Sequence, residues 1–234
     1  MPIYPAGQNL LIDADDTLWE NNIYFERAIA AFIAYLNHKK CTPAEVRKAL
    51  NAVEHEHILS YGYGLGSFTR SLLVCYERLT ARPLSEGDRE RITCFANAIR
   101  TQQIELLPGV QATLQDLATR HRLILMTKGV HAEQTDKLSR SGLANLFDAV
   151  EVVAEKDPAT YAQVIDRHKL NPAISWMIGN SPKSDVNPAL AAGLNAVFLF
   201  HKDTWVLEHA DLATAPEGRT LHELDGFAHL AEIF

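Results

Sequence analysis

Short hydrophobic runs alternate with helical patterns along the second half of the chain. The strand-like runs cover residues 9–12, 122–126, 149–153, 175–178 and 196–200. Hydrophobic positions recur at helical spacing between the later runs, over residues 109–120, 131–141, 158–169 and 186–193. Strands that alternate with helices of this length form βαβ units, in which helices bury both faces of a parallel sheet. We therefore predict an α/β fold with a Rossmann-like parallel sheet and helices on both faces.

A long helical segment interrupts this alternation after the first strand. More than 100 residues separate Asp13 from Arg122, whereas a whole βαβ unit needs about 30. Helical spacing extends over residues 22–40, 42–62, 67–81 and 86–104, and Thr42, Pro43 and Glu45 form a typical helix start. We predict an inserted α-helical domain at residues 20–105, and a main domain made of residues 1–19 and 106–234.

Composition narrows the possible partners. The chain has 234 residues, 47% of them hydrophobic, and a net charge of -7 without a block rich in Lys and Arg. This charge argues against nucleic acid or an anionic membrane as a partner. No hydrophobic run approaches the ~18 residues of a membrane span, and the three cysteines show no CxxC spacing. We expect a cytoplasmic protein with reduced thiols; the sequence leaves its oligomeric state open.

Polar residues follow four of the predicted strands. In an open parallel sheet, ligands bind beyond the carboxyl ends of the strands. If the strands are parallel, one edge of the sheet gathers side chains from four loops: Asp13, Asp15, Thr127, Lys156, Asn180 and Asp185. Carboxylates at close quarters need a cation, and oxygen ligands without His or Cys favour Mg²⁺. Lysine and hydroxyl groups beside such an ion suit a phosphoryl group, which an Asp carboxylate can attack.

Four sequence motifs, in order, resemble those of the haloacid dehalogenase (HAD) superfamily, most of whose members are phosphatases. The first is D13-A-D15-D16-T17, the second is Thr127 in LILMTKG, the third is Lys156 in AEKDPATYAQVI, and the fourth is G179-N180-SPKS-D185. The helical insertion between the first and second motifs resembles the C1-type cap of that family. The resemblance therefore implies a catalytic core at 1–19 and 106–234 and a helical cap at 20–105.

The resemblance also implies a role for each motif residue. Asp13 would be the nucleophile and a Mg²⁺ ligand, while Asp15 would act as acid and base and bind the ion through its backbone carbonyl. Thr127 and Lys156 would orient the phosphoryl group. Asn180 and Asp185 would complete the metal site, although the sequence leaves open which of them contacts the ion. Asn180 stands where the family often has Asp, and the neutral amide lowers the charge of the ligand set.

Two further residues are candidates for substrate binding. Lys128 stands where the family often has Asn, and its side chain either adds positive potential at the site or points to solvent. Tyr63 lies in the glycine-rich segment YGYGLGSF, which is either a flexible turn of the cap or a loop that lowers a tyrosine over the site.

These observations predict a Mg²⁺-dependent phosphatase that hydrolyses a small phosphorylated metabolite through an aspartyl-phosphate. A phosphomutase or phosphotransferase on the same scaffold is the alternative. A haloacid dehalogenase is disfavoured because its chemistry does not need Asp15. A catalytically idle phosphate-binding protein is disfavoured because Asp13, Asp15 and Lys156 are all present.

Overall fold

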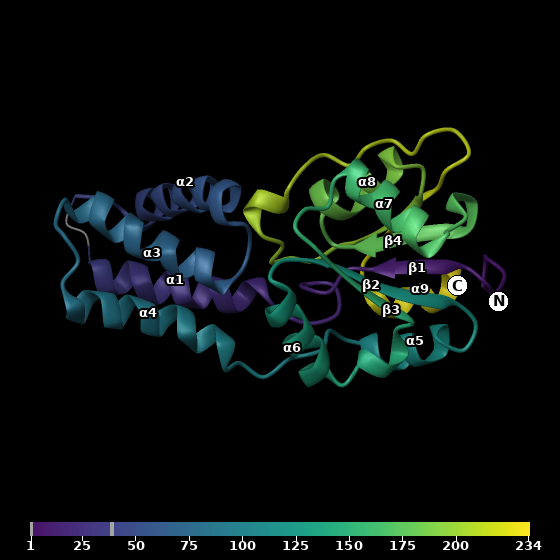
Figure 1. The fold of residues 1–234 in the computed structure, drawn as a ribbon, viewed down its shortest axis with the longest axis horizontal. Helices are drawn as coiled ribbons and strands as arrows, with labels where there is room; N and C mark the ends of the chain where they lie inside the picture. The colour runs from purple at the N-terminus through teal and green to yellow at the C-terminus, as the bar shows by residue number, and fades with distance from the viewer. Residues whose placement is uncertain (1, 38–39) are drawn as a thin grey trace. The chain divides into compact units, whose positions relative to one another are not determined.

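The structure is a computed structural model that describes residues 2–37 and 40–234. The chain divides into two compact units (Figure 1). The first, here called the core unit, comprises Met1–Asn22 and Ile104–Phe234, and the second, the helical unit, comprises Ile23–Gln103. The roles of catalytic core and cap, which the sequence assigns to such a division, stay predictions.

In the described part of the chain, the core unit contains a six-stranded sheet with the order β3-β2-β1-β4-β5-β6. All neighbouring strands pair in parallel. The strands are β1 (Asn9–Ile12), β2 (Arg122–Lys128), β3 (Ala149–Val153), β4 (Ser175–Gly179), β5 (Asn195–Leu199) and β6 (Leu221–Leu224). The predicted α/β, Rossmann-like fold is confirmed. The strand order reverses direction at β1, which is where parallel sheets bind ligands.

Helices cover both faces of this sheet. Figure 1 shows α7 and α8 on one side, with α5 and α6 on the other. The core-unit helices are α5 (Val110–Leu117), α6 (His131–Ser141), α7 (Pro158–His168), α8 (Asn187–Ala191) and α9 (Leu230–Ile233). A π-helical turn, η3 (Pro182–Val186), joins β4 to α8, and 3₁₀ turns lie at Ala144–Leu146, Pro172–Ile174, Val206–Glu208 and Phe227–His229.

The first strand shows how the sequence determines these layers. Successive side chains of a strand point to opposite faces of the sheet. Leu10 and Ile12 accordingly pack in the cluster that contains Leu114 of α5. Leu11 packs in the other cluster, with Tyr161 of α7. Full burial of an aliphatic side chain stabilises the fold by about 1.5–3 kcal/mol, so both faces hold β1 in place.

The helical unit has a hydrophobic core of its own. It contains Ile23–Leu36 of α1 (Asn22–Leu36), together with α2 (Pro43–Tyr61), α3 (Leu65–Thr80) and α4 (Glu86–Arg100). One fully buried side chain from each helix meets the others in one cluster: Phe32, Leu50, Leu72 and Ile92. Thr42 and Glu45 form the expected capping box at the start of α2. Residues 38–39 of the first predicted helix lie outside the described residues.

Two elements differ from the sequence expectation. The edge strand β6 was not predicted, because its sequence LHEL is short, polar at two of four positions and only partly buried. The helix predicted at 186–193 is shorter than expected: it is α8, Asn187–Ala191, and the π-helical turn Pro182–Val186 precedes it. Asp185 N–H and Val186 N–H both donate to Ser181 O, at 2.9 and 3.1 Å. This wider turn buries the Asp185 side chain.

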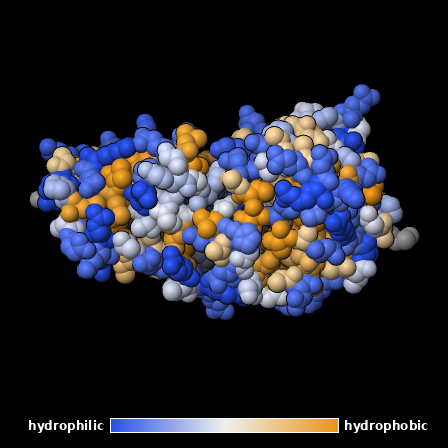
Figure 2. All heavy atoms as spheres, in the orientation of Figure 1, coloured by the Kyte–Doolittle hydropathy of each residue, from blue (hydrophilic) through white to orange (hydrophobic). Residues whose placement is uncertain are grey.

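On the face shown in Figure 2, hydrophilic residues surround smaller groups of hydrophobic ones. Within residues 2–37 and 40–234, no helix is both long and apolar enough to cross a membrane.

Candidate active site

The candidate site begins where β1 ends. Ile12 pairs with Leu125 of β2 and with Ile178 of β4, so the three strands reach the same edge of the sheet. The Asp13 N–H donates to Ile178 O at 2.9 Å and continues the ladder by one residue. Asp13 is thereby placed between the loops that follow β2 and β4, and its side chain is buried.

Lys156 joins two of the predicted carboxylates. Its Nζ lies 2.5 Å from Asp13 Oδ1 and 2.7 Å from Asp185 Oδ1, and its side chain is only 1% exposed. Burial would lower the pKa of Lys156, but the charges of Asp13 and Asp185 hold it above its usual value. Burial, followed by the charge of Asp185, raises the pKa of Asp13 to about 7 despite Lys156. A single ammonium therefore neutralises only part of the negative charge of this pair.

Asp185 owes its position to the turn after β4 and to Gly179. The Ser181 N–H donates to Asp185 Oδ2 at 3.0 Å. A Cβ on residue 179 would lie 2.2 Å from the same oxygen, which is closer than any real contact. The glycine of the fourth motif thus makes room for the Asp185 carboxylate against the backbone.

Thr17 links Asp13 to Asn180. Its Oγ1 lies 3.1 Å from Asp13 Oδ2 and 3.2 Å from Asn180 Oδ1, and it can donate to one of them at a time. The Asn180 Nδ2 donates to Thr204 Oγ1 at 2.9 Å. This second bond fixes the amide so that its oxygen faces the hydroxyl of Thr17.

Asp15 has partners that the sequence reasoning did not identify. Lys137 Nζ lies 2.6 Å from both of its carboxylate oxygens. Gln134 Nε2 donates to Oδ2 at 3.0 Å, and Trp19 Nε1 donates to Oδ1 at 2.7 Å. Burial would raise the pKa of Asp15, but the charge of Lys137 and these hydrogen bonds hold it below its usual value. The available signal was the spacing of Gln134 and Lys137, three residues apart on one face of the helix after Thr127.

Lys128 is turned inward and paired. Its Nζ lies 2.7 Å from Ser184 Oγ and 2.8 Å from Glu208 Oε1, and its side chain is 12% exposed. Of the two alternatives left open by the sequence, the solvent-directed one does not agree with this geometry. Glu208 already pairs with the charge of Lys128. The predicted contact of Lys128 with substrate stays a prediction.

The two remaining candidates occupy different units. Thr127 is buried in β2, where it pairs with Val152 of β3 close to the end of the strand. Tyr63 belongs to the helical unit, between α2 and α3. The roles of Thr127 in orienting a phosphoryl group and of Tyr63 in binding substrate therefore stay predictions.

The chemistry of the donor atoms fits a magnesium ion. Asp13, Asp185 and Asn180 supply side-chain oxygens from adjoining loops, and no His or Cys belongs to this group. Asp13 and Asp185 share the single ammonium of Lys156, and a divalent cation would balance the remaining negative charge. Asp13, Asn180, Asp185 and the backbone carbonyl of Asp15 are the groups that would hold the ion.

Comparison with known proteins identifies the family. The haloacid dehalogenase-like hydrolase profile matches residues 8–193, which include every motif residue of the core unit. This chain is a haloacid dehalogenase-like hydrolase. The resemblance proposed from the four motifs is thereby confirmed at the level of the family, although the type of cap is not.

Curated relatives of this hydrolase are phosphatases. Glyceraldehyde 3-phosphate phosphatase of Methanothermobacter thermautotrophicus is 32% identical over 203 residues, which cover 81% of this chain and 84% of that protein. N-acylneuraminate-9-phosphatase of Rattus norvegicus is 29% identical over 108 residues, and the match spans 44% of either protein. The chain thus matches less than half the length of this second relative.

Solved structures of the family share the fold. A haloacid dehalogenase-like family hydrolase from Xanthomonas campestris aligns with a TM-score of 0.80 and 31% identity, over 97% of this chain and 93% of that one. L-2-haloacid dehalogenase from Xanthobacter autotrophicus aligns with a TM-score of 0.64 over 96% of each chain, but at 14% identity. The second similarity concerns the fold alone.

Proposed function

We propose that this hydrolase is a Mg²⁺-dependent phosphatase that acts on a small phosphorylated metabolite. The observation that carries the proposal is the position of Lys156 between Asp13 and Asp185, with a second carboxylate, Asp15, two residues beyond Asp13. The phosphatase relatives support the reaction class. Their own substrates differ from one another, so the metabolite is left open.

The reaction would proceed in two displacements. An Asp13 carboxylate oxygen attacks phosphorus, the bond between phosphorus and the ester oxygen breaks, and Asp15 donates a proton to the departing alkoxide. Asp15 then accepts a proton from water, and the resulting hydroxide attacks phosphorus and releases phosphate from Asp13. The proton that Asp15 gains in the second step replaces the one that it gave in the first. The first step therefore needs the protonated form of Asp15, although Lys137 and the hydrogen bonds to this carboxylate hold its pKa below the usual value.

The surrounding residues would support both displacements. The Lys156 ammonium is close enough to Asp13 to stabilise the charge of the transferring phosphoryl group. A hydrogen bond from Thr17 to Asp13 Oδ2 would hold that carboxylate in a fixed direction. When bound, Mg²⁺ would neutralise charge on the phosphoryl oxygens.

We assign substrate selection to the helical unit. The helical unit has a hydrophobic core of its own, so its surface loops can vary without disturbing the strands that precede Asp13 and Lys156. Tyr63, in the glycine-containing turn between α2 and α3, is our candidate for a substrate contact in this unit. Because enclosure excludes water from the reacting group, such a cap would favour transfer to one bound water.

The test is metal-dependent release of inorganic phosphate from p-nitrophenyl phosphate. Asp13→Asn removes the nucleophile and should abolish turnover, and EDTA should abolish turnover of the wild type. Asp136→Asn is the matched control, because Asp136 is a 58% exposed aspartate on α6 and pairs only with Arg140 in the described structure. The control should keep wild-type activity. Turnover that persists in Asp13→Asn, or turnover of the wild type that persists in the presence of EDTA, would contradict the proposal.

Detection of the covalent intermediate separates this mechanism from direct attack by water. In Asp15→Asn the phosphoryl group should stay on Asp13, because water is no longer activated. Acid-quenched Asp15→Asn should therefore gain the mass of one phosphoryl group after incubation with substrate and Mg²⁺. The double variant Asp13→Asn/Asp15→Asn should gain none.

A further inference from the structure

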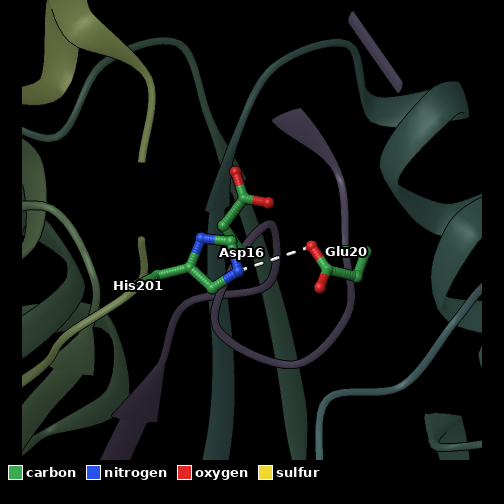
Figure 3. Close-up of side chains that lie close together, drawn as sticks. All are labelled: Asp16, Glu20 and His201. Atoms are coloured by element: carbon green, nitrogen blue, oxygen red, sulfur yellow. Dashed lines mark ion pairs between the residues drawn. The ribbon is translucent and has the colours of Figure 1, made fainter. Parts of the chain in front are cut away.

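A second group of potential ligands lies outside the Lys156 cluster. Asp16 and Glu20 come from the loop between β1 and α1, and His201 follows β5. Figure 3 shows their side chains converging on one place from the loop after β1 and from the segment after β5. One ligand atom from each lies within 4.8 Å of the others, and His201 Nε2 is 3.4 Å from Glu20 Oε2.

Two atoms of this group are buried without a hydrogen-bond partner among the described residues. They are His201 Nδ1 and Glu20 Oε2, and the His201 side chain is only 9% exposed. Buried polar atoms normally have partners, because each unsatisfied one costs about 1–3 kcal/mol. The unmade bond of Glu20 Oε2, the oxygen that faces His201 Nε2, therefore points to a ligand that the protein itself does not supply.

Asp16 is held in a fixed orientation at this place. Its Oδ1 accepts hydrogen bonds from Asn21 N–H at 2.8 Å and from Asn22 N–H at 3.0 Å. The neighbouring carboxylates Asp13 and Asp15 have lysine partners. In the described part of the chain, neither Asp16 nor Glu20 forms an ion pair with a lysine or arginine. Within the described residues, the only ion pair of these two carboxylates is the one between Glu20 and His201.

We propose that Asp16, Glu20 and His201 form a second divalent-cation site, which takes a transition metal such as Zn²⁺ or Mn²⁺. One imidazole and two carboxylates are a mixed nitrogen and oxygen donor set, which suits these ions better than Mg²⁺. Donors bound to one Zn²⁺ at about 2.0–2.2 Å are at most about 4.4 Å apart. Movements of a few tenths of an ångström in Glu20 and His201 would bring the three donors within that limit.

Such an ion would tie two segments of the core unit together. The loop before α1 and the segment after β5 already meet through a hydrogen bond from Asn22 Nδ2 to Asp203 O, at 2.8 Å. A cation held by Glu20 and His201 would add a second connection between them. The proposal does not depend on the phosphatase reaction, because none of its three ligands serves that reaction as proposed here.

Pulsed electron paramagnetic resonance of bound Mn²⁺ can distinguish this site from the proposed magnesium site. Mn²⁺ added to the metal-free, untagged full chain should show nitrogen modulation from one imidazole, since the donors around Asp13 are oxygens. His201→Gln should lose that modulation. His229→Gln is the matched control, because His229 also pairs with a glutamate, Glu232, but is 52% exposed; it should keep the signal. No modulation in the wild type, or unchanged modulation in His201→Gln, would overturn the proposal.

Calorimetric titration with Zn²⁺ provides a test that keeps the histidine. Glu20→Gln should weaken Zn²⁺ binding at the second site at least about tenfold, whereas Glu232→Gln should leave it unchanged. Circular dichroism verifies that each variant is folded. Equal Zn²⁺ affinity in Glu20→Gln and the wild type would show that Glu20 is not a ligand and would refute the site.

Discussion

Asp15 is restrained by three donors, and two of them come from one face of α6. Lys137 contacts both carboxylate oxygens, and Gln134 contacts one of them. In the proposed reaction this carboxylate must exchange protons with the leaving group and with water, so its direction decides the rate. In that reaction Lys137 would be a positioning residue for Asp15, although it lies outside the four sequence motifs.

Replacement of Lys137 should impair turnover without weakening substrate binding. Lys137→Met removes both bonds from Nζ to Asp15, and a misdirected acid–base group costs about 10- to 100-fold in kcat. KM should change little, since Lys137 has no proposed contact with substrate. Lys137→Arg keeps a cationic donor and should restore most of kcat. Steady-state phosphate release measures both constants, and a rise in KM at constant kcat would contradict the positioning role.

At the scale of elements, α2 carries a carboxylate into the core of the helical unit. Glu54 is buried, and its Oε2 has no hydrogen-bond partner among the described residues. Burial raises the pKa of Glu54 to about 7; Arg47 opposes the shift and Glu26 adds to it. The native state therefore holds a proton on Glu54 at pH values where the unfolded chain has released it.

The stability of the wild type should consequently fall as the pH rises. Above the ordinary pKa of glutamate the unfolded state loses its proton first, so the free energy of unfolding decreases until about pH 7 and then levels off. The contribution of Glu54 is on the order of 3 kcal/mol. Glu54→Gln should remove this contribution and be the more stable protein at pH 8, as read from urea unfolding by circular dichroism. The decrease that remains in the variant includes the part due to Asp13, whose pKa is also raised to about 7. Glu90→Gln, at an exposed position of α4, is the control and should retain the wild-type dependence.

At the scale of the whole molecule, the two units have separate hydrophobic cores, and the candidate magnesium ligands all belong to one of them. Asp13, Asn180 and Asp185 reach one place from loops after β1 and β4. A ligand that binds only the folded arrangement of these loops stabilises the native state by mass action. Magnesium should therefore act as a stabiliser of the core unit.

Thermal unfolding with and without Mg²⁺ tests this expectation. At 100 times its dissociation constant, an ion adds about 2.7 kcal/mol to the free energy of unfolding. For a chain of this size that raises Tm by about 5–10 °C. Asp185→Asn should lose the Mg²⁺-dependent shift, while Asp136→Asn should keep it. If Mg²⁺ raised Tm equally in Asp185→Asn and the wild type, its site would lie elsewhere in the protein.

The sequence by itself determined five strands of the sheet and the polar residues that follow four of them. Strands such as β1 and β4 are buried on both faces, so their continuous hydrophobic runs can be recognised without any tertiary contact. Parallel pairing then forces Asp13 and Asp185 to the same edge, because all the carboxyl ends point in one direction. The family resemblance, which rested on these positions, was confirmed by comparison with known proteins, while the catalytic roles of the residues stay predictions.

Only the tertiary structure decided which side chains meet across that edge. Lys137, Glu208 and His201 lie more than 50 residues from Asp15, Lys128 and Glu20, their respective partners. Such contacts depend on how loops pack after the sheet has formed, and no local periodicity records them. The edge strand β6 escaped prediction for a related reason: its pairing with β5, rather than its own hydrophobic pattern, makes it a strand. Local hydrophobic patterns show which positions are buried. Which two charged residues distant in sequence meet depends on how the chain folds between them.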